Sequence, residues 1–163
     1  MINSWFTVEK IDRDTWIISE YRHPEETHCY LLNGSGCSLL IDTGLGIGNI
    51  YDEVKRLTDN PVTAVATHVH WDHIGGHKYF SDFYAHREET KWLSGEFPLP
   101  VEMIRRMVID HCDLPENYDI DTYTVFQGTP TRILKDGDIF SREIWYVKVR
   151  CLHIIPPRTR EII

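Results

Sequence analysis

The sequence predicts a protein of the α/β or α+β class, in which helices cover the faces of a β-sheet. Short β-rich runs both precede and follow segments whose apolar residues recur at helical spacing. Residues 37–67 indicate strand, helix and strand in succession, which is the order of a βαβ unit. A chain of 163 residues can bury about 70% of its unfolded surface, enough for one core but not for two ordinary domains. We therefore expect a single domain over residues 1–163.

The first third of the chain indicates a β-meander. The expected strands are residues 5–11, 15–19, 28–33 and 37–42. Residues 12–14 (DRD) form a turn, and residues 34–36 (GSG) are a credible hairpin loop between the last two strands. After Asp42 comes TGLGIG, whose glycines permit sharp turns and a close approach of the backbone.

A helix and a buried strand are expected next. Asn49 can cap the N-terminus of a helix. Ile50, Val54 and Leu57 then fall on one face of that helix. Residues 62–67 (VTAVAT) form a short apolar run that is typical of a buried strand. Together with the preceding strand, they complete the βαβ unit.

The second half of the chain begins with a helical region. Residues 86–114 carry apolar residues at a spacing of three to four, and Pro98 and Pro100 divide the region. Further strands are expected at residues 123–126, 131–134 and 143–155. Residues 135–138 (KDGD) indicate a tight turn between two of these strands.

The composition argues against several classes of partner. Seventeen basic and 25 acidic residues give a net charge of −8, which disfavours a nucleic-acid interface. Charges interrupt every apolar stretch before it reaches the length of a membrane span, and the N-terminus lacks the pattern of a signal peptide. The cysteines form no CxxC pair and suggest reduced, buried thiols: Cys29, Cys37, Cys112 and Cys151. We expect a cytoplasmic protein that acts on a small molecule.

The strongest functional signal is a cluster of metal-ligating side chains directly after the buried strand. His68, His70, Asp72 and His73 form the pattern HxHxDH and are followed by Gly75-Gly76. In an extended segment, residues i and i+2 point to the same side, so His68 and His70 can reach one cation. Asp72 and His73 lie where the chain turns and can face a second cation. Imidazole and carboxylate ligands suit Zn²⁺, with iron or manganese as alternatives.

The alternative interpretation of the motif is a group of surface histidines in a polar turn. That interpretation leaves the ordered arrangement of three histidines and an aspartate without a reason. The remaining histidines stand alone, and for them we expect ordinary solvated or hydrogen-bonded roles: His23, His28, His77, His86, His111 and His153.

The motifs SLLIDTGLG, AVATHVHWDHIGG and ILKDGDIF resemble those of the metallo-β-lactamase fold hydrolases. The resemblance implies a four-layer αββα sandwich with a dinuclear metal site, usually of two zinc ions, at one edge of the sheets. It implies that His68 and His70 hold one metal and that Asp72 and His73 hold the other, with Asp72 also orienting the attacking hydroxide. Asp42 resembles the aspartate that supports the metal loop from the neighbouring strand; a turn or capping aspartate is the alternative. His70, where another branch has Glu, favours the hydrolases over the flavin-partnered di-iron proteins.

The sequence departs from the family pattern after residues 135–138. Family members continue to a Pro-Gly-His-Thr/Ser segment, a bridging Asp and a last His, whereas this sequence ends at Ile163. His153 aligns before the Pro-Gly position, so we do not count it as a ligand. We expect the N-terminal half of the sandwich plus the first strands of the second half. A frameshift near codon 155 is one hypothesis for this truncation.

Two functions from different classes follow. The first is a metal-dependent hydrolase in which a metal-bound hydroxide attacks a small ester, thioester or lactone. The second is a non-catalytic remnant or weak metal-binding module, because each metal has only two of the three protein ligands that a catalytic zinc site usually has. A helix-rich interaction protein that binds no metal is a third interpretation. The oligomeric state is left open.

Overall fold

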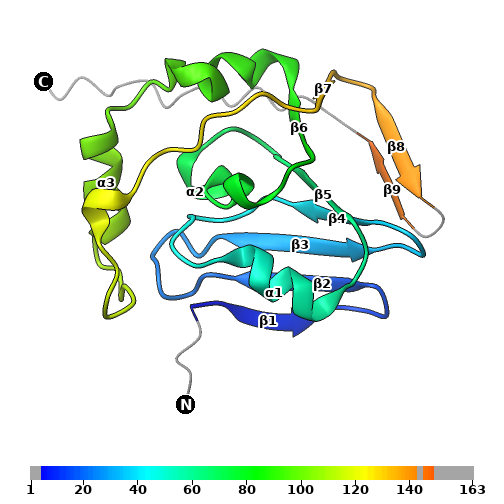
Figure 1. The fold of residues 1–163 in the computed structure, drawn as a ribbon, viewed down its shortest axis with the longest axis horizontal. Coiled ribbons are helices and arrows are strands. Elements are labelled where there is room, and N and C mark those ends of the chain that lie inside the picture. The colour runs from blue at the N-terminus through cyan, green and yellow to red at the C-terminus, as the bar shows by residue number, and fades with distance from the viewer. Residues whose placement is uncertain (1–4, 143–144, 149–163) are drawn as a thin grey trace, which may run out of the picture.

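A mixed β-sheet organises the chain (Figure 1). The computed structural model describes residues 5–142 and 145–148, and within them seven strands form one sheet in the order β1 to β7. The bounds are β1 Thr7–Lys10, β2 Thr15–Ser19, β3 His28–Asn33, β4 Ser38–Ile41, β5 Val62–Val65, β6 Phe83–His86 and β7 Arg132–Leu134. Strands β1 to β4 pair antiparallel, and β4 to β7 pair parallel. The α/β class is therefore confirmed.

The βαβ unit predicted at residues 37–67 is present. β4 and β5 are parallel neighbours, and α1 (Ile50–Leu57) connects them. The side chain of Asn49 accepts a hydrogen bond from the amide of Tyr51, so the predicted N-cap is confirmed. Ile50 and Val54 of α1 are completely buried, as the helical spacing of the apolar residues requires.

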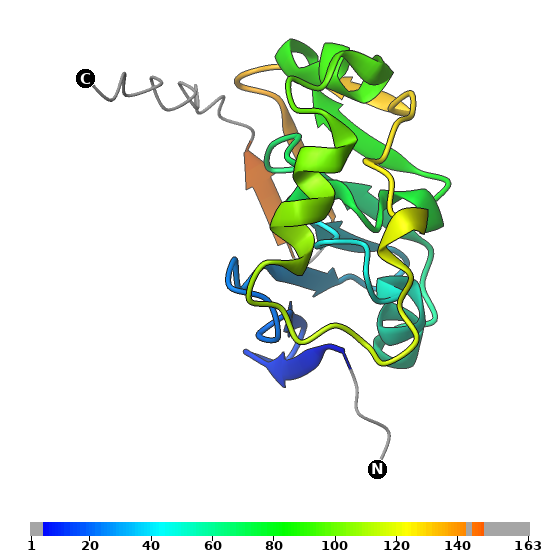
Figure 2. The same ribbon diagram turned by 90° about the vertical axis from the view of Figure 1, so that its left-hand side faces the viewer.

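The remaining helices are short and lie between the later strands. They are α2 Trp71–Ile74, η1 His77–Tyr79, η2 Arg87–Glu89, the π-helix η3 Trp92–Glu96, α3 Val101–Ile109 and η4 Ile120–Thr122. A two-stranded antiparallel sheet, β8 Ile139–Arg142 and β9 Trp145–Lys148, follows β7. Figures 1 and 2 together show α1 and α2 on one face of the large sheet and the β8–β9 hairpin on the opposite side. Within the described residues, these two strands form a second sheet.

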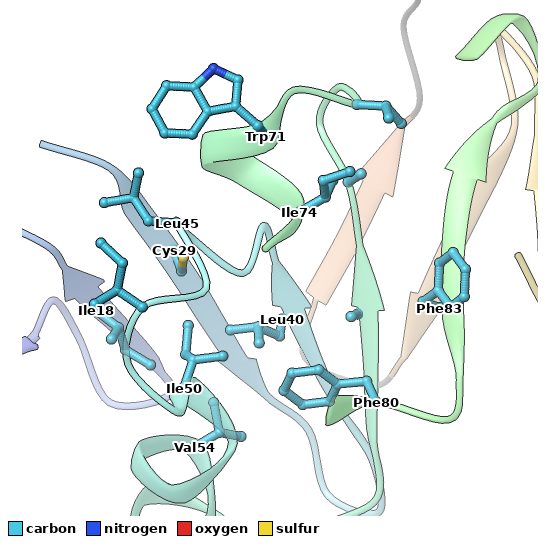
Figure 3. Packing of buried hydrophobic residues seen from close by; sticks show 14 of the residues in the cluster. Ile18, Cys29, Leu40, Leu45, Ile50, Val54, Trp71, Ile74, Phe80 and Phe83 are labelled. Atoms are coloured by element: carbon cyan, nitrogen blue, oxygen red, sulfur yellow. The ribbon is translucent and has the colours of Figure 1, made fainter. Parts of the chain in front are cut away.

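Two apolar clusters lie on the two faces of the sheet. The larger cluster joins residues of the strands, such as Ile18 and Leu40, to Ile50 of α1 and Ile74 of α2 (Figure 3). The smaller cluster lies on the opposite face and is built from Leu39, Val65 and Leu134, with Leu32, Ile41 and Tyr84 packed against it. Adjacent residues Leu39 and Leu40 contribute to different clusters because side chains alternate along a strand.

Several predicted elements differ from those observed. β6 and β8 are not among the predicted strands, and the predicted strand at residues 123–126 is wrong. Tyr123 is buried there, but Arg105 donates to its carbonyl oxygen at 3.1 Å, so that oxygen is engaged by a side chain rather than by a neighbouring strand. Part of the expected helical region is 3₁₀- or π-helix rather than α-helix. The strand expected at 143–155 is described only as β9, and its remaining residues lie outside the described part of the chain.

The cysteines that the structure describes are free thiols. Cys29 is buried, as expected, whereas Cys37 and Cys112 are partly exposed, so the expectation of burial is wrong for these two. Burial raises the pKa of the Cys29 thiol well above its ordinary value. Cys151 lies outside the described residues. Across residues 5–142 and 145–148, no helix has the length and apolar character needed to cross a membrane.

The glycine loop, residues 43–48, packs directly on the end of α2. The amide of Gly75 donates to the carbonyl oxygen of Gly44 at 2.8 Å, and the amide of Thr43 donates to that of His73 at 2.8 Å. A Cβ atom on Gly75 would lie 2.2 Å from the carbonyl oxygen of Leu45. Glycine is thus needed at Gly75 because backbone meets backbone, although its φ of −58° suits any residue.

Replacing this glycine tests the contact. Gly75→Ala should lower the free energy of unfolding by about 2 kcal/mol or more, since the loop or α2 must move. Gly36→Ala is the matched control because a Cβ atom on Gly36 would have nothing within 4 Å, and it should change stability by less than about 0.5 kcal/mol. Urea unfolding measures both. Equal stability of the two variants would contradict the close packing of loop and helix.

Candidate metal centre

The predicted metal-binding motif lies at the carboxyl end of β5. This strand has parallel neighbours on both sides, β4 and β6, so residues that follow it emerge at the edge where mixed α/β sheets usually bind ligands. His68 lies in a bend after β5, and His70, which has an extended backbone, is the residue before α2. Asp72 and His73 lie within α2. The change from extended chain to helix thus occurs inside the motif.

The structure brings the four motif side chains together. The ring centroids of His68 and His70 are 4.8 Å apart, and those of His68 and His73 are 4.1 Å apart. The Nε2 atom of His73 lies 3.3 Å from an Asp72 carboxylate oxygen. Asp42, from the end of β4, joins this cluster through a hydrogen bond of 2.9 Å from Nδ1 of His73.

Asp42, at the end of the neighbouring strand β4, also binds Thr67, the residue directly before the motif. Its Oδ1 atom accepts a hydrogen bond from the amide of Thr67 at 2.7 Å, and its Oδ2 atom accepts one from the Thr67 hydroxyl at 2.7 Å. The residue is buried and has a φ of +59°, a left-handed conformation that is uncommon outside glycine. These contacts run to the metal loop and not to a helix N-terminus, so they favour a supporting role over a capping one.

The pKa shifts of the four motif side chains separate them into two pairs. Burial, together with the neighbouring His73 and His70, lowers the pKa of His68 to about 4, and burial also lowers the pKa of His70. Burial alone would lower the pKa of His73 too, but hydrogen bonds to Asp42 and Asp72 outweigh it and raise this pKa to about 10. Burial would raise the pKa of Asp72, yet the contact with His73 keeps it below its ordinary value. At neutral pH the first two imidazoles are therefore uncharged, and His73 and Asp72 form an ion pair.

The donor chemistry of this cluster fits a transition metal, although the side chains are not arranged around one. Uncharged imidazoles and ionised carboxylates are the forms that bind zinc. Among the described residues, no group of three His, Cys, Asp or Glu side chains is placed to hold a metal ion. Both ring nitrogens of His73 face carboxylates, Nδ1 that of Asp42 and Nε2 that of Asp72. The 3.3 Å between Nε2 of His73 and the Asp72 oxygen is compatible with two ligands of one zinc ion, so the two side chains can bind the same metal without separating.

A comparison with protein families identifies the family of this chain. The model of the metallo-beta-lactamase superfamily matches residues 23–149, which is most of the chain and includes the whole motif. The chain belongs to the metallo-beta-lactamase superfamily. The resemblance that the motifs indicate is therefore confirmed.

The most similar relatives within this superfamily include thioesterases. The chain is 28% identical to the acyl-coenzyme A thioesterase MBLAC2 of Gallus gallus over 149 residues, which covers 84% of this chain and 53% of that protein. It is 28% identical to the Homo sapiens protein of the same name over 152 residues, with coverages of 84% and 54%. The chain spans about half the length of the relatives it matches.

Solved structures of the superfamily share the fold. BJP-1, a subclass B3 metallo-beta-lactamase of Bradyrhizobium japonicum, has a TM-score of 0.58 at 18% identity, covering 90% of this chain and 53% of its own. A metallo-beta-lactamase from Pontibacter korlensis has a TM-score of 0.57 at 20% identity, covering 83% of this chain and 55% of its own. The seven-stranded sheet and its helices thus correspond to about half of a metallo-beta-lactamase fold.

Each of the other described histidines makes a hydrogen bond or is exposed, as expected, and His86 accepts one from the amide of Glu88; the buried Nε2 atoms of His77 and His86, however, have no hydrogen-bond partner among the described residues. The buried His77 bonds through Nδ1 to the hydroxyl of Thr43 at 2.6 Å, and His23 bonds to the carbonyl oxygen of Met107. His28 bonds to Ser19, and His111 is exposed beside Asp110. His153 lies outside the described residues.

Sequence reasoning missed three side chains that hold the surroundings of the motif: Glu20, Glu89 and Trp92. Glu20 is completely buried beneath the glycine loop. Its Oε2 atom accepts a hydrogen bond from the amide of Leu45 at 2.8 Å, and its Oε1 atom accepts one from the Trp5 indole at 2.6 Å. The only signal in the sequence is a charged residue at the end of an apolar strand, which does not reveal its partners.

The buried Glu20 carboxyl predicts a pH-dependent stability. Burial raises its pKa to about 7, despite the hydrogen bonds from Trp5 and Leu45 and with smaller contributions from the charges of Asp72 and His73. The ordinary value is 4.5, so between about pH 4.5 and pH 7 the folded state keeps a proton that the unfolded state loses. The Glu20 carboxyl should therefore lower the free energy of unfolding, on the order of 3 kcal/mol, as the pH rises through this window, whereas the lowered pKa values of His68 and His77 act in the opposite direction.

Urea unfolding at pH 5 and at pH 7.5 measures this effect. Glu20→Gln should remove this contribution, so its change in the free energy of unfolding from pH 5 to pH 7.5 should be more positive than that of the wild type by about 3 kcal/mol, whatever its stability at a single pH. Glu9→Gln is the matched control, because Glu9 is exposed on β1 and the variant should keep the wild-type dependence. The same difference between the two pH values in wild type and E20Q would contradict the assignment.

Proposed function

We propose that this chain is the motif-bearing part of a metal-dependent hydrolase that acts on a small thioester or a related ester or lactone. The observation that carries the proposal is the cluster of His68, His70, Asp72 and His73 at the carboxyl end of β5, in a member of the metallo-beta-lactamase superfamily. No other part of the described chain gathers as many metal-binding side chains of this chemistry on one loop and helix.

The motif residues would share two metal ions. His68 and His70 would hold the first, and Asp72 and His73 the second, with zinc the best match and iron or manganese as alternatives. When bound, such ions polarise a carbonyl oxygen and make a water molecule more acidic. The uncharged state of His68 and His70 at neutral pH favours binding, because a ligand must offer a lone pair.

The protein's own groups would orient the reaction. The Asp72 carboxylate is ionised at neutral pH and can accept a hydrogen bond from an attacking water molecule. Asp42 is placed to hold the His73 ring by its Nδ1 atom, which leaves Nε2 as the ligand atom. Through Thr67, Asp42 also holds the segment that carries His68.

The thioester is the favoured substrate class because relatives at 28–29% identity are named acyl-coenzyme A thioesterases. The chain spans about half the length of those proteins, so their activity is only a proposal for this chain.

A non-catalytic or weakly metal-binding module is the second candidate. It is favoured by the finding that, within the described residues, no group of three His, Cys, Asp or Glu side chains is placed to hold a metal ion. The single-domain organisation and the cytoplasmic location stay predictions.

Metal content and thioester hydrolysis test the proposal together. Protein purified from zinc-supplemented medium should contain up to two equivalents of zinc by elemental analysis and should release thiol from acyl-coenzyme A substrates. His70→Ala should lower kcat/KM by about 100-fold or more and remove at least part of the metal.

His111→Ala is the control, since His111 is exposed and lies outside the motif; it should change neither quantity. Hydrolysis that survives His70→Ala at full rate would contradict the proposal. Substoichiometric zinc without turnover in the wild type would favour the non-catalytic module instead.

A further inference from the structure

The segment after β6, residues 87–97, lies against the loop that carries the first two histidines. We call it the bracing segment; it comprises η2, η3 and the residues beside them. Three of its side chains contact the loop: Glu89 through a hydrogen bond, and Trp92 and Phe97 through ring contacts with His70. We propose that Glu89 and Trp92 are positioning residues that hold His68 and His70 in the orientation needed to bind metal. This inference rests on the proposed function.

Glu89 holds the backbone between the two histidines. Its Oε1 atom accepts a hydrogen bond from the amide of Val69 at 3.1 Å. On the other side of His68, the amide of Thr67 donates to Asp42 at 2.7 Å. The two amides that flank His68 are therefore each bonded to a carboxylate from a different element. Hydrogen bonds to charged groups are stronger than neutral ones, so this arrangement restricts the backbone on both sides of the ligand.

Burial makes the Glu89 contact specific. The Val69 side chain is completely buried. Its amide lies beyond the end of β5, outside the residues that pair with β6, so the sheet offers it no hydrogen-bond partner. Glu89 is itself partly buried, and this burial raises its pKa. Removing the acceptor would leave a backbone N–H in a poorly solvated position, which costs about 1–3 kcal/mol. The loop would then relax to satisfy that amide elsewhere.

Trp92 restricts the second histidine through its ring. The indole and the His70 imidazole are stacked, with planes 12° apart and centroids 5.8 Å apart. Phe97 meets both rings at an angle, with centroids 6.3 Å from His70 and 5.5 Å from Trp92. Rings in this offset-stacked and edge-to-face geometry attract each other by about 0.5–1.5 kcal/mol per pair. Rotation of the His70 ring would lose these contacts.

The bracing segment is itself anchored. Leu93 is buried in the main core, and its carbonyl oxygen accepts a hydrogen bond from the amide of Gly128 at 3.0 Å. Gly95 has a φ of +101°, which lets the π-helix end and turn towards Phe97. π-Helical turns are rare and occur frequently at functional sites. Because Leu93 is fixed in the core, the adjacent Trp92 and the preceding Glu89 are also held in place.

Zinc affinity, measured by competition with a chromophoric chelator, tests the role of each residue. Glu89→Asp withdraws the carboxylate by one methylene and should weaken zinc binding about 10-fold, whereas Glu89→Gln keeps an acceptor oxygen at the same reach and should stay within about 3-fold. Trp92→Ala should also weaken binding about 10-fold, and Trp92→Phe should restore most of it. Trp92→Leu keeps apolar bulk without a ring and replaces the alanine variant if that does not fold.

Controls separate positioning from general stability. Glu88→Gln changes an exposed carboxylate on the same turn that pairs with Arg87, and Trp16→Phe changes a tryptophan on β2; both should bind zinc as the wild type does. Melting temperatures with chelator present establish that each metal-free variant is folded. The visible absorption of cobalt-loaded protein should change in E89D and W92A, because it reports ligand geometry.

The outcomes distinguish this inference from the proposed function. Zinc uptake by the wild type, with unchanged affinity and cobalt spectra in folded E89D and W92A, would overturn the positioning roles alone. No zinc uptake by the wild type would overturn both. Equal weakening by E89D and E89Q would contradict the hydrogen-bond role of Glu89, and failure of W92F to recover affinity would contradict the stacking role of Trp92.

Discussion

The surroundings of the candidate metal centre depend on one carboxylate, that of Asp42. It lies at the end of β4 and reaches across to the chain that leaves the parallel neighbour β5, where it binds Thr67 and His73. One side chain therefore fixes both the entry to the motif and its last histidine. The cost is a left-handed backbone at a buried non-glycine residue, and such strain persists where the surrounding structure compensates for it.

Three carboxylates play the same structural role around the motif and the glycine loop. Asp42, Glu89 and Glu20 each accept a hydrogen bond from a backbone amide, of Thr67, Val69 and Leu45 respectively. Loops at the end of a parallel sheet leave the ladder and carry amides without strand partners. Buried or partly buried acceptors from neighbouring elements satisfy these amides and fix the loops at the same time. The glycine loop adds close backbone packing, because Gly75 admits no side chain against Leu45.

The features that can be predicted from the sequence are those that depend on residues close together in the chain. The cap at Asn49, the buried face of α1 and the motif at the end of β5 follow from spacing within a few residues. Asp42 is identified through a family motif, IDTG. The strand β6 and the partners of Glu20 and Glu89 are not predictable, since they depend on contacts between residues from 15 to 48 positions apart. Tyr123 is misleading because its burial arises in a loop held by Arg105 and not in a strand.

The arrangement of the motif at a strand end predicts that metal binds among its side chains. Anomalous X-ray diffraction at the zinc edge, from crystals grown with zinc, measures this directly. The expected result is a peak about 2.0–2.1 Å from ring nitrogens of both His68 and His70. A crystal without any peak at this edge of the sheet would contradict the assignment of a metal centre.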